Sequence, residues 1–412
     1  MDTLDVVVTH GAGLDIHKKV IAATVFTPTL AETRSFGTVT DQLLALGDWL
    51  VASGVTHVAM EATGVYWKPV VNVLESYEFD AVLVVNPQTI RGMPGRKTDV
   101  QDSQWIASLL RIGALQGSYI PARPQRELRE LVRYRTSLIQ MRAQEANRLQ
   151  KVLEGANVKL SSVITDILGV TGQRILAALA AGETDPVSLA QLADGRIRAS
   201  QEDLAAALHG MIQRHQQWML TVQWELITCL DRQIATLNTE ISARLTQLDD
   251  ALTRLETIPG VGRRTAEIII AEVGVDRQRF PSARHLSSWA GFSPGQNESA
   301  GTAHPARTRK GSKALRAALV EAGQAAGKTK TYLGAVYHHL AGRRGKKRAA
   351  MATGRHILIA AYAILKTPDT VYHDLGINYF DQRDRQAVVR RETRRLEALG
   401  YKVTLEPVPT SS

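Results

Sequence analysis

The segment Gly13-Leu14-Asp15-Ile16-His17 decides the fold class, because it puts a carboxylate at the end of the first predicted strand. A second apolar run, Val55–Met60, also ends on a carboxylate, Glu61, and a small polar turn follows it. Short β-branched runs that alternate with helical stretches predict a mixed α/β sheet flanked by helices. We therefore expect Asp15 and Glu61 at strand ends of an N-terminal α/β domain that covers residues 5–125.

The remaining elements of this domain follow from the alternation of β-branched runs and longer amphipathic stretches. Each predicted strand is short, and each predicted helix separates two strands. The predicted strands are Val6–Val8, Ile21–Phe26, Val55–Met60 and Ala81–Val85, and the predicted helices are Asp41–Leu50 and Lys68–Tyr77.

Two further carboxylates lie in Lys97-Thr98-Asp99-Val100-Gln101-Asp102, where a helix over Ser103–Leu110 is predicted to begin. Side chains three residues apart share one face of a helix, so Asp99 and Asp102 point the same way. Together with the two strand-end acids they are able to hold a pair of divalent cations, with Mg²⁺ or Mn²⁺ as the hard ions that carboxylate oxygens prefer. The ordinary alternative, four unrelated surface charges, stays open on composition alone.

Length and charge limit the class of partner. A chain of 412 residues predicts two or three domains, and a net charge of +10 with a pI near 9.7 favours a polyanion such as nucleic acid. Lys18 and Lys97 stand beside the carboxylates and are candidates for phosphate contact. Two clusters carry much of the other positive charge: Arg307, Arg309, Lys310, Lys313 and Arg316, then Arg343, Arg344, Lys346, Lys347 and Arg348.

The chain has one cysteine, Cys229, which excludes an internal disulfide and a cysteine-rich zinc site. The acidic stretch Met1–Asp5 predicts no signal peptide. No apolar run reaches the roughly 18 residues that a membrane-spanning helix needs. We expect a cytoplasmic protein without a membrane partner, in a prokaryotic cell whose DNA shares that compartment.

Residues 126–250 are predicted to be helical, with two apolar stripes at heptad spacing. The pattern indicates a helical hairpin or a coiled coil, and hence either packing within the chain or self-association. The first stripe comprises Leu128, Val132, Ile139, Ala146, Leu149 and Leu153, and the second comprises Leu230, Ile234, Leu237, Ile241, Leu245 and Leu248.

Pro259-Gly260-Val261-Gly262 opens a mainly α-helical domain over residues 251–345, which a basic helical tail over 346–412 follows. The turn separates a helix that ends near Glu256 from a helix over Arg264–Val273, as in a helix-hairpin-helix. Gly260 and Gly262 would let backbone N–H groups approach a phosphate at the start of the second helix. A glycine-containing turn that only joins two helices is the alternative.

The four acids Asp15, Glu61, Asp99 and Asp102 resemble the DEDD set of the insertion-sequence transposases numbered one-ten and eleven-eleven. Residues 258–266, 291–301 and 308–316 resemble the C-terminal transposase domain of that family. By this resemblance Ser299 matches the family's nucleophile, although Glu298-Ser299-Ala300-Gly301 stands where many relatives have Ser-Ser-Gly. Other serines of this region, such as Ser293 and Ser312, are equally eligible on composition.

The resemblance implies a RuvC-like, RNase H-like N-terminal domain and a recombinase that excises and inserts its own element. It also implies donor and target DNA as substrates, a structured non-coding bridge RNA as guide, and dimers that pair into a tetramer with composite active sites. One alternative is a metal-dependent nuclease similar to Holliday-junction resolvases, which hydrolyses DNA with water. Another is a nucleic-acid-binding protein without catalysis, against which the intact acidic set argues.

Overall fold

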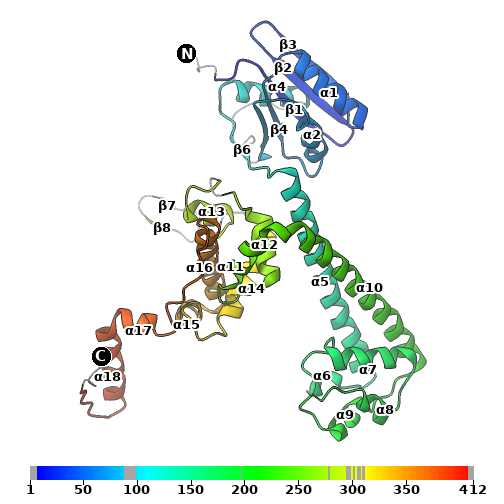
Figure 1. The fold of residues 1–412 in the computed structure, drawn as a ribbon, viewed down its shortest axis with the longest axis vertical. Helices are drawn as coiled ribbons and strands as arrows, with labels where there is room; N and C mark the ends of the chain where they lie inside the picture. The colour runs from blue at the N-terminus through cyan, green and yellow to red at the C-terminus, as the bar shows by residue number, and fades with distance from the viewer. Residues whose placement is uncertain are drawn as a thin grey trace. The chain divides into compact units, whose positions relative to one another are not determined.

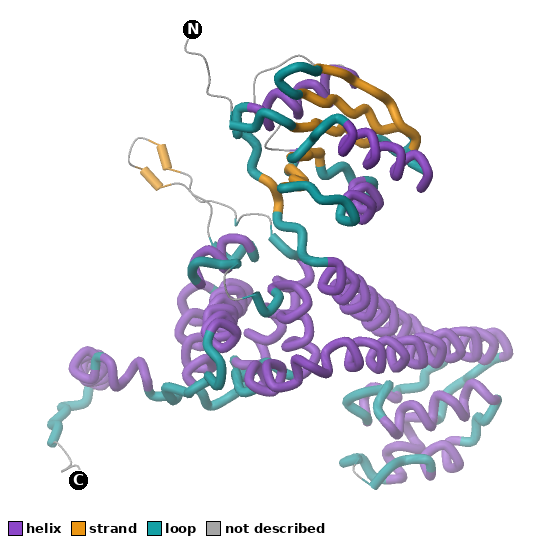
Figure 2. The backbone as a smooth tube through the Cα atoms, turned by 45° about the horizontal axis from the view of Figure 1, so that its top comes forward, coloured by secondary structure: helices purple, strands orange, loops and turns teal. Residues whose placement is uncertain are grey.

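The computed structural model describes residues 7–87, 99–195, 197–276, 279–293, 298–299, 302–303, 308 and 311–406. The chain forms two compact units, Met1–Arg126 and Glu127–Ser412. The six-stranded sheet lies in the first unit, whereas the described part of the second unit is helical apart from the strand pair β7–β8 (Figure 2). The predicted α/β plus α fold class is therefore confirmed.

The first unit is built on a mixed sheet with the strand order β3-β2-β1-β4-β5-β6. Its middle strand, β1, pairs antiparallel with β2 and parallel with β4, and β4 pairs parallel with β5. Within the described residues, helices α1, α2 and α4 accompany the sheet (Figure 1). The strands are β1 (Gly11–Ile16), β2 (Val20–Phe26), β3 (Ala31–Gly37), β4 (His57–Glu61), β5 (Ala81–Val85) and β6 (Gly117–Ser118), and the helices are α1 (Thr40–Ala52), α2 (Trp67–Leu74) and α4 (Asp99–Arg111).

Alternating residues of the central strands serve two separate cores, because successive side chains of a strand point to opposite faces. Leu14 of β1 and Met60 of β4 are fully buried in the core that α1 and α2 complete. On the other face Ala59 packs with α4 residues such as Ile106 and Leu110. The sheet is therefore covered on both sides within this unit.

The strand expected to end at Asp15 is confirmed as Gly11–Ile16. The separate strand expected over Val6–Val8 is wrong at Val7 and Val8, which donate backbone hydrogen bonds to the carbonyl of Arg111, and Val6 lies outside the described residues. The β-branched run misled the prediction, because glycine has low strand propensity and Gly11 and Gly13 weakened the signal of the true strand. Strand β3 was not predicted either, since its sequence is largely polar and it forms an edge of the sheet.

Two long helices open the second unit. Helix α5 (Arg123–Gly155) begins in the first unit, and its residues from Glu127 onward pack against α10 (Arg214–Leu245). Leu138 contacts Leu230 and Ile234 in one small core. The start of α5 is paired with the end of α10 through Glu127 and Arg244, and a later part of α5 with an earlier part of α10 through Arg142 and Asp231. The two helices therefore run antiparallel. The two predicted stripes thus pack against each other within one chain.

Four short helices join the far ends of this hairpin and share a core with them, in which Leu149 and Ile227 are fully buried. Helix α8 starts with Asp185 as its cap, and α9 starts with Ser200 as its cap. These helices are α6 (Leu160–Val163), α7 (Val170–Ala181), α8 (Pro186–Gln191) and α9 (Gln201–Leu208).

In the largest core of the second unit, the C-terminal helices pack around four fully buried residues, Leu255, Ile269, Leu319 and Ile357. Because α16 supplies Ile357, this core continues across the predicted domain boundary at residue 345. Helices α17 (Tyr379–Arg383) and α18 (Arg385–Ala398) bury no residue. The core elements are η1 (Thr246–Leu248), α11 (Asp249–Glu256), α12 (Arg263–Val273), α13 (Ala283–Trp289), α14 (Lys313–Ala326), α15 (Tyr332–Arg344) and α16 (Lys346–Lys366).

Candidate functional site

The first two predicted site residues occupy neighbouring strand ends. Strands β1 and β4 run parallel, and their last paired residues are Leu14 and Met60. Asp15 and Glu61 follow these residues directly, so they lie side by side at the carboxyl ends of adjacent strands, which are about 4.8 Å apart. Leu14 and Met60 face the α1–α2 core, and their successors therefore face α4. Asp15 is 7% exposed and Glu61 is half-buried.

Helix α4 brings the other two acids to the same end of the sheet. A methyl group at Gly13 would lie 2.3 Å from the backbone nitrogen of Ala107, and one at Gly11 would lie 3.0 Å from a side-chain carbon of Leu110. Later residues of α4 thus face earlier residues of β1, and the helix runs antiparallel to the strand. Its first turn, which carries Asp99 and Asp102, lies toward the strand ends (Figure 1).

Small residues fix this position of α4. The Ser103 hydroxyl is fully buried and lies 2.8 Å from the hydroxyl of Thr24, which β-sheet pairing places opposite Gly13. The same Gly13 methyl would lie 2.4 Å from the carbonyl oxygen of Ser103, so only glycine permits the contact. These positioning residues were not predicted, although the Gly11-x-Gly13 pattern in a strand is a signal of close backbone approach.

Basic groups also stand near the first carboxylate. His17 Nε2 lies 2.9 Å from Asp15 Oδ2 and helps to orient that carboxylate. Lys18 is exposed in the same β1–β2 turn, which suits a contact with phosphate. Lys97, the other predicted phosphate contact here, lies outside the described residues.

The donor chemistry of this edge fits a hard divalent cation, because all four predicted ligands are carboxylates. Asp102 is half-buried, while the side chain of Asp99 lies outside the described part. Among the side chains that are described, no group of three or more His, Cys, Asp or Glu is placed to hold a metal ion. Asp15, Glu61 and Asp102 thus share one end of the sheet without closing on a common point.

Ser299 lies in the second unit, on a hairpin between α13 and α14. Strand β7 (Glu298–Ser299) pairs antiparallel with β8 (Thr302–Ala303), and Ser299 stands opposite Thr302. The backbone of Ser299 is described, and its side chain is not. Of the predicted cations nearby, Arg307, Arg309 and Lys310 lie outside the described residues.

The last two cations of that cluster differ in their surroundings. Lys313 is the first residue of α14 and is exposed, so it is accessible to a nucleic acid. Arg316 is half-buried and donates from Nη2 to the carbonyl of Gly291 at 3.0 Å. Arg316 therefore has a structural contact within the protein.

The predicted helix-hairpin-helix residues also separate into two kinds. Gly260 has a φ of +86°, and a methyl group there would lie 2.3 Å from the carbonyl oxygen of Ala322 in α14, so internal packing accounts for this glycine. Gly262 is exposed, precedes α12 without a side-chain cap, and a methyl group there would meet nothing within 4 Å. The backbone at Gly262 is therefore the part of the turn that is open to a phosphate.

The chain matches two family models. Residues 12–158 match the model of IS110-type DEDD transposases, and residues 252–338 match the transposase IS116/IS110/IS902 family. The two matched ranges contain the acidic edge of the sheet and the serine hairpin, respectively. The chain belongs to the IS110 transposase family. It is accordingly a DNA transposase or recombinase, and a divalent metal is in keeping with its DEDD domain.

Two curated relatives are similar over most of their length. The pilin gene-inverting protein of Moraxella lacunata is 24% identical over 319 residues, which are 74% of this chain and 80% of the relative. The pilin gene-inverting protein of Moraxella bovis gives the same identity and coverage. Among the described residues of this transposase, no helix is long and apolar enough to cross a membrane.

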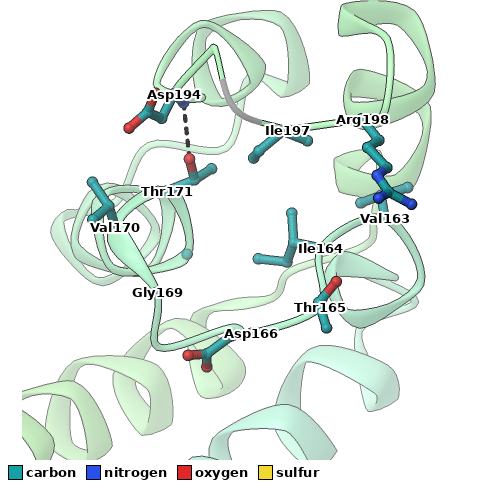
Figure 3. Close-up of a pocket in the computed structure, with 11 residues that line it drawn as sticks. Val163, Ile164, Thr165, Asp166, Gly169, Val170, Thr171, Asp194, Ile197 and Arg198 are labelled. Carbon is teal, nitrogen blue, oxygen red and sulfur yellow. Dashed lines mark hydrogen bonds between the residues drawn. The ribbon is translucent and has the colours of Figure 1, made fainter. Parts of the chain in front are cut away.

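A separate pocket of about 610 Å³ lies among the short helices α6–α9 of the second unit (Figure 3). Asp166, Asp194 and Arg198 line it, and the backbone N–H of Asp194 donates to the Thr171 hydroxyl at 2.8 Å. None of the predicted site residues lines this pocket.

Proposed function

We propose that this transposase excises and inserts its own insertion sequence through metal-assisted attack of Ser299 on DNA. The observation that carries the proposal is the arrival of Asp15, Glu61 and Asp102 at one end of the sheet, with Asp99 on the same helical turn as Asp102. These four residues would hold Mg²⁺ or Mn²⁺. Such ions, when bound, stabilise charge on the attacked phosphate and on the leaving oxygen.

The side chains around this edge have separate tasks in the proposal. His17 holds the Asp15 carboxylate in one orientation, and exposed Lys18 contacts a neighbouring phosphate. Lys313, Arg307, Arg309 and Lys310 bind phosphates of the strand that reaches the serine. These cations reduce the repulsion between DNA and the serine's attacking oxygen.

The covalent step conserves the energy of the broken bond. The Ser299 hydroxyl loses its proton, and its oxygen bonds to phosphorus while the bond from phosphorus to the 3′ oxygen breaks. The 3′ oxygen leaves with a proton, and the 5′ phosphate stays on the serine as a diester. A 3′ hydroxyl of a different strand then reverses the step, so rejoining requires no external energy source.

A denaturing gel tests this assignment directly. We expect Ser299→Ala to remove the covalent protein–DNA adduct and recombination, and to leave DNA binding unchanged. Ser293→Ala is the matched control, since Ser293 lies in the same region and is expected to retain the adduct. An adduct that persists in Ser299→Ala would show that another residue is the nucleophile.

The second candidate function is hydrolysis by a nuclease of the Holliday-junction-resolvase type, which would use the same carboxylates and water. The relatives favour recombination, because inversion of a gene requires rejoining as well as cleavage. If wild-type protein cleaves DNA without an adduct at any time point, hydrolysis is the correct reading.

The proposal includes partners that follow from family membership. They are donor and target DNA, a bridge RNA that pairs with both, and further copies of the chain in a dimer or tetramer. Because the apolar stripes of α5 and α10 pack mainly within one chain, the proposal assigns the contact between copies to other surfaces. Since the proposed substrate is DNA, the proposal also assigns the protein to the prokaryotic cytoplasm, at the nucleoid. Light scattering with and without nucleic acid tests the assembly.

A further inference from the structure

The segment that carries Ser299 leaves the helical core after Phe292 and returns at Gly311, and we call residues 293–311 the serine segment. Its two ends lie against each other. A methyl group at Gly311 would lie 2.3 Å from the carbonyl carbon of Ala290 and 2.6 Å from the nitrogen of Gly291. Arg316 adds its hydrogen bond to the carbonyl of Gly291. The serine segment is therefore closed at its base.

Ser312 follows this base directly and ties it to a neighbouring helix. Its hydroxyl caps α14 by accepting from the N–H of Leu315 at 3.2 Å. The same hydroxyl lies 3.0 Å from Glu272 Oε2 and donates to it. The first residue after the serine segment is thus held by a carboxylate of α12.

Glu272 is held in turn by α5. Its side chain is 1% exposed and receives a two-pronged contact from Arg133, with Nε to Oε1 at 2.6 Å and Nη2 to Oε2 at 2.8 Å. This hydrogen bonding raises the pKa of the Arg133 guanidinium. Arg129 donates to the backbone carbonyls of Ala271 and Glu272. Glu272 therefore joins α5, α12 and the base of the serine segment.

A buried carboxylate costs free energy unless each oxygen is paired, and its presence is weak evidence for stability. The same two helices contain a second such pair, Arg135–Glu267, at 2.7 Å with both side chains at most 5% exposed. Glu267 has no contact with Ser312 in the described structure and stands five positions earlier on α12. The chain thus provides one buried pair that reaches the serine segment and one that does not.

We infer that Glu272 is a positioning residue for the base of the serine segment, and that the rate of the Ser299 reaction depends on it. This inference rests on the proposed role of Ser299. Loss of the carboxylate charge would weaken the hydrogen bonds from Ser312 and Arg133 and loosen one of the contacts at the base of the segment, while leaving the helical core packed. Small displacements of a reacting group reduce rates strongly, so the effect falls on the chemical step.

The test compares Glu272→Gln with Glu267→Gln at saturating DNA. Glu272→Gln is expected to slow adduct formation on the order of ten- to a hundredfold, with an unchanged dissociation constant for DNA. Glu267→Gln is expected to form the adduct within about twofold of the wild-type rate at a similar loss of thermal stability. Equal adduct rates in the two variants would overturn the inference.

Substitutions at Ser312 separate positioning from capping. Ser312→Thr keeps both the cap and the hydroxyl that reaches Glu272, and is expected to form the adduct at the wild-type rate. Ser312→Asp keeps a capping oxygen but puts a second carboxylate against Glu272, and is expected to be as slow as Glu272→Gln. A wild-type rate in Ser312→Asp would contradict the inference. The outcome of Ser299→Ala is independent: an adduct there refutes the proposed nucleophile, whatever Glu272 does.

Discussion

Asp15 and Glu61 stand on strands that are paired on both sides, whereas Ser299 stands on a hairpin of two residue pairs. The sheet fixes the two carboxylates through its ladder of hydrogen bonds and through buried neighbours such as Leu14 and Met60. Within the described residues, the strand of Ser299 forms two residue pairs, and the contacts that fix its segment lie at the base, at Gly311 and Ser312. The sheet therefore holds the two strand-end carboxylates, whereas the described supports of the serine are its short hairpin and the contacts at the base of its segment.

The largest effect is expected from removing one carboxylate of the acidic sheet edge. Asp102→Asn should reduce DNA cleavage by at least roughly a thousandfold, because a ligand for the divalent ions is lost. Thermal unfolding should change little, since Asp102 is half-buried at the start of α4. Cleavage in a gel assay, with and without a chelator, checks this expectation.

Asp41→Asn is the matched control for that experiment, because Asp41 is an exposed acid in the first turn of α1. It should cleave like the wild type. A normal cleavage rate in Asp102→Asn, or in wild type with chelator, would remove the carboxylates from the mechanism.

The next largest effect is expected at Gly13, where β1 packs closely against α4. Gly13→Ala should destabilise the first unit by about 1–3 kcal/mol, because the added methyl overlaps the backbone of Ser103 and Ala107. Cleavage should fall with it as α4 is displaced from β1. Chemical denaturation measures the free energy of unfolding.

Gly37→Ala provides the comparison for Gly13→Ala. Gly37 ends β3, and a methyl group there would meet only the flexible side chain of Gln42, at 3.2 Å. Its effect should stay within about 0.5 kcal/mol. If the two variants are equally stable, close packing on Gly13 does not hold the site together.

The smallest effect is expected at Gly262, in the turn between α11 and α12, where Gly260 provides the contrast. Gly260→Ala should cost about 2–4 kcal/mol, since its φ of +86° and its contact with Ala322 both oppose a side chain. Gly262→Ala should leave stability within about 0.5 kcal/mol, because its surroundings are open. Differential scanning calorimetry distinguishes them.

Nucleic-acid affinity then shows whether the turn binds phosphate. Gly262→Ala should weaken binding severalfold if its backbone approaches a phosphate, and filter binding at low salt measures this. Unchanged affinity in a stably folded Gly262→Ala would leave the turn as a connection between two helices and nothing more.

The sequence predicted the acidic site better than it predicted the supports around it. The strand-end positions of Asp15 and Glu61 followed from the sequence pattern, whereas the role of the four acids as metal ligands rested on the family resemblance and stays a prediction; strands β4 and β5 lie where their β-branched runs indicated. The strand that ends near Asp15 was expected, but its start at Gly11 was not, because the glycines that permit contact with α4 also weaken the local strand signal. At Gly13, strand propensity disfavours glycine, whereas close packing against α4 requires it.

The contacts around the serine had no local signal. Arg133, Glu272 and Ser312 are separated by 139 and 40 positions, and only the tertiary fold brings them together. The apolar stripe on α10 was readable from its periodicity, but its partner was not, because the same period serves a hairpin within one chain and a coiled coil between two. Leu230 and Ile234 pack on Leu138 of the same chain.

The antiparallel contact of β1 with α4 also has a consequence for biosynthesis. Asp15 leaves the ribosome early, but the backbone of Ser103 and Ala107 that packs on Gly13 is made almost a hundred residues later. At roughly 5–20 residues per second, translation needs several seconds to supply that helix. Once Glu61 has also been made, the nascent chain still holds Asp15 and Glu61 without Asp102, so the proposed acidic site is incomplete until α4 has been synthesised.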